Sequence, residues 1–549
     1  MAGIEDVSRT VGAQISLMLK ARGVDVIFGI PGVHNVEMYR GLEEAGITHV
    51  LARHEQGVGF MADGYARASG KPGVAYVITG PGLCNIMTPM GQAYSDSVPV
   101  LVISSCLDDT VSKRGQLHQM RDQRGAAATV CDWSEEARSP EAVFDLIDRA
   151  LVEFDVRRAR PKHIQVPISL LGEKTEVAPE AIPGFDGRSG GILRAGCQQA
   201  MAEDILAARK PLFIFGGGLA TQKKPASGEP KNEVCVRDVL RRSGAAAFTT
   251  YAGGGLLAVD DPFSFGCYLG RPESERIIAE SDLVIAIGTE LSECDLWRDA
   301  LGHSGTLVRV DIDPEMLADR HRADVCIHAD GLDFVQELLE HLPQDAPPKW
   351  ETAIIRAQKA GFRAEVDAAR PGIVPICDAL KGVMPDDAMV FSDMTQFAYV
   401  AKEVWDMQQS GHWHHPSGFG TLGYALPAAI GGAMARRDAP TVCIAGDYGF
   451  QYSVQELGVA VEMKLAIPIL LWDNGKLKEI EDSMVASQIA PNAVEALNPD
   501  FCKLAEAYGC LSEQPATVGA LKEVLLAAFE ADRPTVIRLT PDMAVYRTK

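Results

Sequence analysis

The 549-residue chain lacks several features that mark whole classes of protein. Its 12 cysteines are scattered with no C-x-x-C pair, which argues against a zinc knuckle and against a disulfide framework. No apolar run reaches the roughly 20 residues that a membrane-spanning helix needs. Residues 1–6 have neither the basic nor the apolar region of a signal peptide. We therefore expect a cytoplasmic protein with no membrane partner.

Basic charge is also in short supply. Lys and Arg number 52 against 74 Asp and Glu, which gives a net charge of -22. Nucleic-acid phosphates and anionic membrane faces repel such a protein, so we expect no nucleic-acid partner. The hydrophobic fraction of 47% is ordinary for a globular protein. The length exceeds a single core and fits about three domains.

Short Val/Ile-rich strands alternate with helices along most of the sequence, which predicts parallel sheets wrapped by helices. The expected fold class is α/β, with three doubly wound parallel-sheet domains. We place these domains at residues 1–183, 192–340 and 366–549. A turn-rich stretch, 178–191, and a Pro-containing linker, 342–348, separate them.

One stretch near the C-terminus carries most of the chemical information. Gly446–Gly449 (Gly-Asp-Tyr-Gly) follows a buried strand and opens a helix, and Asp473-Asn474 ends the next strand. Asp447 and Asn474 can hold one hard divalent cation such as Mg²⁺ between them. The flanking glycines and the helix N-terminus suit a diphosphate. Taken alone, both segments are equally explained as common turns.

The stretch resembles the diphosphate–magnesium motif of thiamine diphosphate enzymes. A second segment far upstream, Arg53–Gly57 (Arg-His-Glu-Gln-Gly), resembles the one that carries their cofactor-activating glutamate. Thiamine catalysis needs a carboxyl group beside the aminopyrimidine nitrogen N1′. An apolar pocket raises the pKa of such a carboxyl, which suits proton sharing with a weak ring base. The resemblance thus implies that Glu55 is catalytic, although a lone helix-start carboxylate is usually explained by the helix dipole.

Further loops extend the resemblance over essentially the whole chain. Gly29–Gly32 and Thr79–Asn85 match loops that line the pyrimidine and thiazolium side of the cofactor, which implies contacts from Pro31 and Asn85. Any one of these segments could be an ordinary Gly/Pro turn. Their occurrence in the same order as in the family supports the resemblance.

The remaining loops imply contacts with the rest of the cofactor. Gly418–Pro427 matches the segment that bends it, with Leu422 as an apolar wedge and the backbone of Gly420 and Leu422 bonding the pyrimidine. The implied contacts with the diphosphate are Gln396, Gly446, Tyr448, Gly449 and Asn474. The implied metal ligands are Asp447, Asn474 and the backbone carbonyl of Lys476.

Three positions depart from the family pattern. Tyr448 and Lys476 replace usual glycines, and Asp473 replaces a usual asparagine. A tyrosine at a turn needs a backbone that a non-glycine residue tolerates. Asp473 adds negative charge near a diphosphate, which Lys476 could offset. These changes leave open a non-catalytic, regulatory protein that has kept the fold.

Within the family, the segments Phe28–His34, Arg53–Gly57 and Gly420–Pro427 most resemble the acetolactate synthase-like branch. Inside that branch they are most similar to the 5-guanidino-2-oxopentanoate decarboxylases, as are Leu117-His118 and Asp122–Arg124. The implied activity is non-oxidative decarboxylation of a 2-oxo acid to an aldehyde. The alternative is an acetolactate synthase-type carboligase that joins two 2-oxo acids.

The resemblance also suggests residues of the substrate pocket. His34 and His118 lie on loops that face the thiazolium, where a neutral histidine can relay a proton. Gln119 and Glu479 are candidate substrate contacts, and a carboxylate such as Glu479 pairs well with a guanidinium tail. Surface histidines and a solvated, mixed-charge helix face are the alternatives for these positions.

Thiamine diphosphate and Mg²⁺ are thus the implied cofactors. In the family the cofactor lies between the first domain of one subunit and the third domain of another, which implies a homodimer or homotetramer. Phe215–Gly218 follows a strand and is similar to a dinucleotide cradle, which acetolactate synthases fill with FAD. A lone glycine cluster is weak support, and the polar insertion 222–229 is typical of a surface loop. We expect no FAD.

Overall fold

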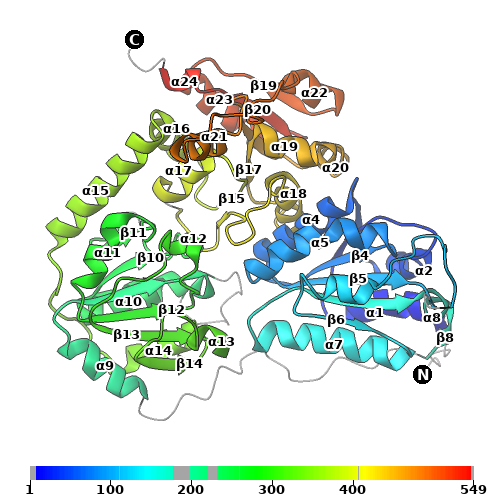
Figure 1. The fold of residues 1–549 in the computed structure, drawn as a ribbon, viewed down its shortest axis with the longest axis horizontal. Coiled ribbons are helices and arrows are strands. Elements are labelled where there is room, and N and C mark those ends of the chain that lie inside the picture. Colours follow the sequence, from blue (N-terminus) through cyan, green and yellow to red (C-terminus); the bar gives the residue numbers. More distant parts are fainter. Residues whose placement is uncertain are drawn as a thin grey trace.

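The computed structural model describes residues 8–109, 112–176, 197–220, 231–258, 260–405 and 407–545. Stretch 178–191 and insertion 222–229 lie outside these residues. Figure 1 shows the first domain in blue and cyan, the central domain in green, and the third in yellow to red. Each contains a sheet of six parallel strands, so the predicted α/β class is confirmed. The expected domain limits stay predictions, and helix α15 (Thr352–Ala369) leads from the central to the third domain.

The first domain has the sheet order β3-β2-β4-β5-β7-β6, and a two-stranded antiparallel pair, β1 with β8, flanks it. Its strands are β1 (Arg9–Thr10), β2 (Val26–Gly29), β3 (Thr48–Leu51), β4 (Gly73–Val77), β5 (Val100–Cys106), β6 (Trp133–Glu136), β7 (Lys162–Pro167) and β8 (Lys174–Thr175). Its helices are α1 (Val11–Ala21), α2 (Val36–Tyr39), α3 (Leu42–Ala45), α4 (Glu55–Ser69), α5 (Pro81–Ser95), α6 (Gln123–Ala127), α7 (Pro140–Val156) and α8 (Ile168–Gly172).

The central domain has the order β11-β10-β9-β12-β13-β14. Its strands are β9 (Pro211–Phe215), β10 (Ala246–Thr249), β11 (Ser264–Gly266), β12 (Leu283–Ile287), β13 (Thr306–Asp311) and β14 (Val325–His328). Its helices are α9 (Cys197–Ala207), the 3-10 turn η1 (Gly217–Leu219), α10 (Asn232–Ser243), α11 (Pro272–Ala279), α12 (Glu293–Leu296), α13 (Pro314–Leu317) and α14 (Gly331–His341).

The third domain has the order β16-β15-β17-β18-β20-β19. Its strands are β15 (Met389–Ser392), β16 (Trp413–His414), β17 (Thr441–Gly446), β18 (Pro468–Trp472), β19 (Leu511–Glu513) and β20 (Thr535–Leu539). Its helices are α16 (Ile373–Lys381), α17 (Gln396–Val404), α18 (Ala425–Ala435), α19 (Asp447–Ser453), the 3-10 turn η2 (Val454–Glu456), α20 (Leu457–Glu462), α21 (Lys478–Ala486), α22 (Phe501–Ala507), α23 (Val518–Phe529) and α24 (Asp542–Val545).

The first and third sheets share one strand order when the strands of each are numbered along the chain, and the central sheet has a different one. In the first sheet the order reverses beside β2 and β4, and in the third beside β15 and β17. Ligands of open parallel sheets bind outside the carboxyl ends of the strands at such switch points. Pro31 and Gly80 lie in the turns at these ends in the first domain. In the third domain, Gln396 and Asp447 there begin helices α17 and α19.

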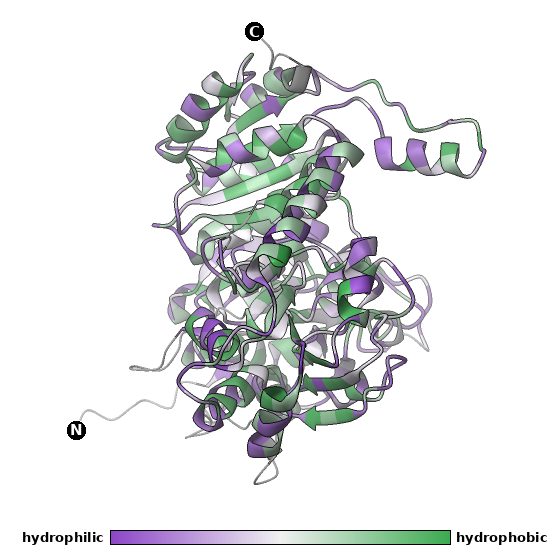
Figure 2. Ribbon diagram, turned by 90° about the vertical axis from the view of Figure 1, so that its left-hand side faces the viewer, coloured by the Kyte–Doolittle hydropathy of each residue, from purple (hydrophilic) through white to green (hydrophobic). Residues whose placement is uncertain are grey.

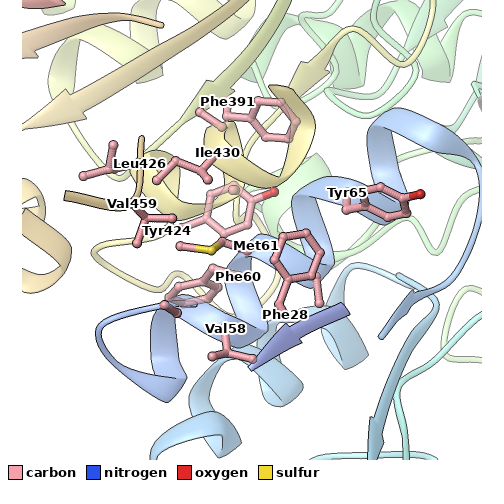
Figure 3. Packing of buried hydrophobic residues seen from close by; sticks show 14 of the residues in the cluster. Phe28, Val58, Phe60, Met61, Tyr65, Phe391, Tyr424, Leu426, Ile430 and Val459 are labelled. Carbon is pink, nitrogen blue, oxygen red and sulfur yellow. The ribbon is translucent and has the colours of Figure 1, made fainter. Parts of the chain in front are cut away.

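The first and third domains are joined by the packing of α4 on α18. A Cβ atom on Gly64 would lie 2.0 Å from the Ala428 carbonyl oxygen, and one on Gly431 would lie 1.9 Å from that of Met61. Glycine therefore allows the two helix backbones to touch. Around this contact, apolar side chains of both domains form one core, including Phe60 from α4 and neighbours from α18 (Figure 3).

Glu456 of η2 ties the third domain to the start of α4. Its carboxylate accepts the backbone N–H of Arg53 at 3.2 and 3.1 Å, two residues before Glu55. Burial raises the pKa of Glu456 to about 7, and the backbone N–H donors of Arg53 and His54 oppose that rise. A buried carboxyl of the third domain thus helps to position the helix that Glu55 opens.

Most helices follow from ordinary amphipathic patterns, and α4 also has clear ends. It begins after His54, whose ring Nδ1 accepts the Gln56 N–H, and it ends at Gly70 in the left-handed conformation. Within the described ranges, no helix combines the length and apolar character that crossing a membrane requires. The expected cytoplasmic location stays a prediction.

We predict that Gly64→Ala lowers the thermal midpoint of unfolding by several degrees, because the added methyl group collides with the Ala428 carbonyl. Overpacking of this kind costs about 1–3 kcal/mol. The matched control is Gly361→Ala in exposed α15, where a Cβ meets nothing within 4 Å and alanine favours the helix. Equal midpoints for the two variants, measured by circular dichroism, would contradict the close contact.

We predict that the thermal midpoint of Glu456→Gln, compared with that of the wild type, rises as the pH increases from 5 to 8. The folded-state pKa of Glu456 lies above its ordinary value, so its stabilising contribution is present at low pH and is lost as the pH passes through about 7. A neutral amide carries no such penalty. A difference between the two proteins that stays constant with pH would contradict this account.

Candidate functional site

Glu55 and Asn85 lie together in the first domain. Glu55 is the first residue of α4 and is half-buried, and Asn85 on α5 donates its Nδ2–H to Glu55 Oε2 at 2.9 Å. Gly82 lies against the same carboxylate, because a Cβ there would be 3.3 Å from Oε1. The carboxylate is thereby held at the carboxyl end of the first sheet; its contact with a pyrimidine ring stays a prediction.

The two candidate catalytic histidines are in contact. His34 Nδ1 and His118 Nδ1 lie 3.3 Å apart, and the rings meet edge to face. Burial and, to a smaller extent, the neighbouring His118 lower the pKa of His34, which favours a neutral ring near pH 7. His118 has a φ of 63°, a conformation that few residues other than glycine adopt. Its carbonyl packs against Gly80, which supports the strained turn.

The residues near the two histidines differ in their exposure and in their hydrogen-bond partners. Pro31 is exposed at the end of β2, while the Gly32 N–H is held by Asn35. Gln119 folds back on its own loop, with its amide donating to the Lys113 carbonyl at 2.8 Å and accepting the Gln116 N–H at 3.3 Å. Gln119 thus supports the loop that carries His118. Gln123 Oε1 accepts the Gly80 N–H, which links that loop to the end of β4.

In the third domain the candidate metal ligands lie side by side. Asp447 begins α19 and is buried, and its Oδ2 accepts the Gly475 N–H at 2.8 Å. Asn474 precedes Gly475 in the turn after β18, and its Oδ1 accepts the Lys476 N–H at 3.2 Å. One carboxylate, one amide oxygen and nearby backbone carbonyls form the hard donor set that Mg²⁺ prefers.

The tyrosine in the motif causes no backbone strain. Tyr448 lies in the first turn of α19 and is absent from the residues with positive φ. Its ring packs against that of Tyr452, one turn further on. Gly446 and Gly449 are the positions where a side chain would clash, since a Cβ would lie 3.0 Å from the Thr395 Cβ and 2.9 Å from Asp393 Oδ2 respectively.

The additional charge of Asp473 is neutralised within the domain. Arg538 on β20 pairs with Asp473 Oδ2 at 2.6 Å, and Asn498 donates to Asp473 at 2.9 Å and to Asp447 at 2.7 Å. Lys476, expected to offset this charge, pairs with Glu481 instead. Burial and, less strongly, the nearby Asp473 raise the pKa of Asp447. Neither Arg538 nor Asn498 was predicted as a site residue, because both are distant from the motif in the chain.

Gln396 and Glu479 form one network with an arginine. Gln396 donates to Glu479 Oε1 at 2.9 Å, and its Oε1 lies 3.5 Å from the Asn474 Nδ2. Arg370 donates to both oxygens of Glu479, at 2.9 and 2.8 Å. Glu479 therefore lies two hydrogen-bonding steps from a candidate metal ligand, and its carboxylate binds a guanidinium of the protein itself.

The loop that would bend the cofactor is held by a buried carboxyl. Gly420 is exposed with a φ of 66°, and Leu422 is half-buried. Asp393, at the end of β15, accepts the Gly423 N–H at 2.8 Å. Burial raises the pKa of Asp393 to about 6, against the lowering effect of backbone N–H donors at the start of α18. Asp393 was not predicted as a site residue.

Within one chain, Glu55 and the bending loop lie at different ends of α5. Asn85, beside Glu55, is near the start of this helix, whereas Gln92 accepts a hydrogen bond from Thr421 and Asp96 accepts one from the Gly418 N–H. Gln92 lies seven positions after Asn85, roughly 10 Å along the helix at the usual rise. Glu55 and the start of the bending loop thus contact α5 at different points, while the end of the loop approaches Gln56, whose Nε2 would lie 3.5 Å from a Cβ on Gly423.

The residues at the switch points fit the predicted cofactors, thiamine diphosphate and Mg²⁺. The switch-point loops offer a helix N-terminus with nearby glycines for a diphosphate, and the Asp447 and Asn474 oxygens for a cation. Across the described ranges, no group of three or more His, Cys, Asp and Glu side chains could hold a metal. The predicted magnesium site is not such a group, because its only acidic side chain is Asp447 and its other ligands would be an amide oxygen and a backbone carbonyl.

The glycine cluster of the central domain is engaged by its own sheet. The Gly216 N–H donates to the Ile287 carbonyl and the Gly218 N–H to that of Gly288. A Cβ on Gly216 would lie 2.1 Å from the Gly288 oxygen. These backbone groups, which a dinucleotide would use, therefore already have partners.

Comparison with protein families assigns all three domains. Residues 9–126 match the N-terminal TPP binding domain of thiamine pyrophosphate enzymes, residues 198–338 match their central domain, and residues 393–539 match their C-terminal TPP binding domain. These matches cover both halves of the candidate site.

Curated relatives extend over nearly the whole chain. A probable 2-ketoarginine decarboxylase of Pseudomonas aeruginosa is 42% identical over 538 residues, 96% of this chain and 94% of the relative. The large subunit of acetolactate synthase isozyme 3 of Escherichia coli is 28% identical over 93% of this chain and 91% of its own. The acetolactate synthase large subunit of Haemophilus influenzae is 27% identical over 93% and 90%. The chain therefore belongs to the thiamine pyrophosphate enzymes and is itself an enzyme, a decarboxylase or a carboligase.

Proposed function

We propose that the protein decarboxylates a 2-oxo acid with a guanidinium tail, 5-guanidino-2-oxopentanoate, to an aldehyde, using thiamine diphosphate and Mg²⁺. The observation that carries this proposal is the 42% identity over 96% of the chain to a probable 2-ketoarginine decarboxylase. The guanidinium already bound by Glu479 gives independent support, because it lies in the same network as Asn474. FAD forms no part of this proposal, since the cradle amides have other partners.

The residues divide the work by position. Glu55, held by Asn85, would share a proton with the cofactor's N1′ nitrogen, while Asp447, Asn474 and the Lys476 carbonyl would hold Mg²⁺. When bound, the cofactor supplies a carbon that accepts the electrons released with CO₂. The His34 and His118 rings, in contact through Nδ1, would move a proton to the product.

We propose further that two copies of the chain complete each site. In a single chain, Glu55 bonds to Asn85 near the start of α5, whereas the loop of Gly420 and Leu422 bonds to Gln92 and Asp96 further along the same helix. Exposed apolar side chains flank both halves, such as Val33 at 67% beside His34, and Leu497 at 102% after α21. Helix α21 buries none of its own side chains and projects from the third domain (Figure 2). A homodimer, or a dimer of such dimers, would cover these surfaces.

The second candidate function is a carboligase of the acetolactate synthase type. It is favoured by the acetolactate synthase relatives, which match 93% of the chain at 28% and 27% identity. The two activities share the steps up to CO₂ release and differ in the fate of the remaining fragment. The identity of the product therefore separates them.

The proposed activity is tested by CO₂ release from a panel of 2-oxo acids with thiamine diphosphate and Mg²⁺ present. The panel contains 5-guanidino-2-oxopentanoate, pyruvate, and branched-chain and aromatic acids, with products identified by mass. We expect kcat/KM for the guanidino acid to exceed that for pyruvate by at least about tenfold. Acetolactate formed from pyruvate as the main product would contradict the decarboxylase proposal.

Glu55→Gln is the matched control for this assay. It should lose turnover of every acid while keeping Mg²⁺-dependent binding of the cofactor, because the amide cannot share a proton with N1′. Turnover that persists in Glu55→Gln would contradict the role of Glu55.

We predict that Arg538→Met weakens thiamine diphosphate binding by about tenfold or more, since Asp473 is then left as an unpaired charge beside the diphosphate site. The double variant Arg538→Met/Asp473→Asn should recover the affinity, because both charges are gone. Calorimetric titration of the cofactor at fixed Mg²⁺ measures the affinity of the single and the double variant.

Arg533→Met is the control for this pair, because Arg533 belongs to an exposed pair with Asp532 close to the same strand and should have little effect. A double variant as weak as Arg538→Met alone would contradict the compensation.

A further inference from the structure

A side-chain carboxylate in the third domain already binds a guanidinium. Arg370, the residue that follows α15, donates Nε–H and a terminal N–H to the two oxygens of Glu479, at 2.9 and 2.8 Å. Gln396 adds a third donor to Glu479 at 2.9 Å. The Arg370 guanidinium also lies 5.5 Å from the centre of the Tyr399 ring. A carboxylate and an aromatic ring thus surround one planar cation.

These are the chemical features by which proteins recognise a guanidinium. Two parallel N–H···O bonds match the planar fork to a carboxylate, and an aromatic ring stabilises the cation. An ammonium group is a point charge and lacks the two parallel N–H groups of this planar fork. The group lies in the predicted site, because Gln396 connects Glu479 to Asn474.

Arg370 can separate from Glu479 without leaving a fully buried charge unpaired. The Arg370 side chain is 21% exposed, and that of Glu479 is 36% exposed. Glu479 belongs to α21, none of whose side chains is buried within the chain. Both side chains are thus exposed enough for water to solvate their charges when the pair separates.

We propose that Arg370 is an internal occupant of a guanidinium site, and that a guanidinium-bearing substrate exchanges with it at Glu479. This inference rests on the proposed function and specifies how the site selects its substrate. With Arg370 in place the Glu479 charge is neutralised, so a 2-oxo acid with an apolar tail gains nothing there. A guanidinium tail takes over the same two hydrogen bonds.

The test uses methylguanidinium as the probe, titrated calorimetrically into enzyme loaded with thiamine diphosphate and Mg²⁺. Arg370→Ala should bind the probe at least about tenfold more tightly than the wild type, because the internal competitor is gone. Arg370→Ala/Glu479→Gln should lose this gain. The matched control is Arg363→Ala. Arg363 belongs to α15, the helix that Arg370 follows, and it pairs with Asp378. This variant should bind the probe as the wild type does.

Two outcomes would overturn the inference: Arg370→Ala binding the probe no more tightly than the wild type, or binding it equally well with and without Glu479. Arg370→Lys is the second variant, should the alanine variant not fold. It keeps the charge but cannot form the fork, and it should also bind the probe more tightly than the wild type; equal binding would count against the exchange.

Kinetics separate this inference from the proposed function. Glu479→Gln should lower the ratio of kcat/KM for the guanidino acid over that for pyruvate by at least about tenfold. An unchanged ratio would overturn the guanidinium site while leaving the decarboxylase proposal intact. No turnover of the guanidino acid, together with Glu479-dependent binding of the probe to Arg370→Ala, would refute the proposed substrate and support the site.

Discussion

The contact between α4 and α18 is the constraint on which the rest of the structure depends. Two glycines, Gly64 and Gly431, let these helices meet backbone to backbone, and the surrounding apolar side chains join the first and third domains in one core. Because α4 begins with Glu55 and α18 begins just after the loop of Leu422, this contact sets the distance between them in one chain. The packing that stabilises the chain therefore also fixes how the two predicted halves of a site lie relative to each other within it.

Electrostatics in the third domain show how a family motif tolerates substitution. Asp473 would bring a second carboxylate to a site built for a diphosphate, but Arg538 and Asn498 pair with it. Tyr448 is accommodated because its backbone is helical. The fold therefore accommodates both departures from the family pattern without an unpaired charge at Asp473 or a strained backbone at Tyr448.

Much of the fold was predictable, because alternating strands and helices and the glycine-bearing turns are local signals. The three parallel sheets and the contacts of Glu55 with Asn85, and of Asp447 with the turn of Asn474, follow from the ends of strands meeting at one edge. The pairs Arg538–Asp473 and Arg370–Glu479 could not be predicted, since they join residues 65 and 109 positions apart. The hydrogen bonds of the Gln119 amide within its own loop could also not be predicted from the sequence.

The central claim is that Glu55 of one chain acts with Asp447 of another. Mixing two inactive variants, Glu55→Gln and Asp447→Asn, under conditions that exchange subunits tests it most directly. If each site is shared, mixed dimers contain one intact site, and about one quarter of the wild-type activity should return. If each site belongs to a single chain, every site carries a defect and the mixture stays inactive, which would contradict the account.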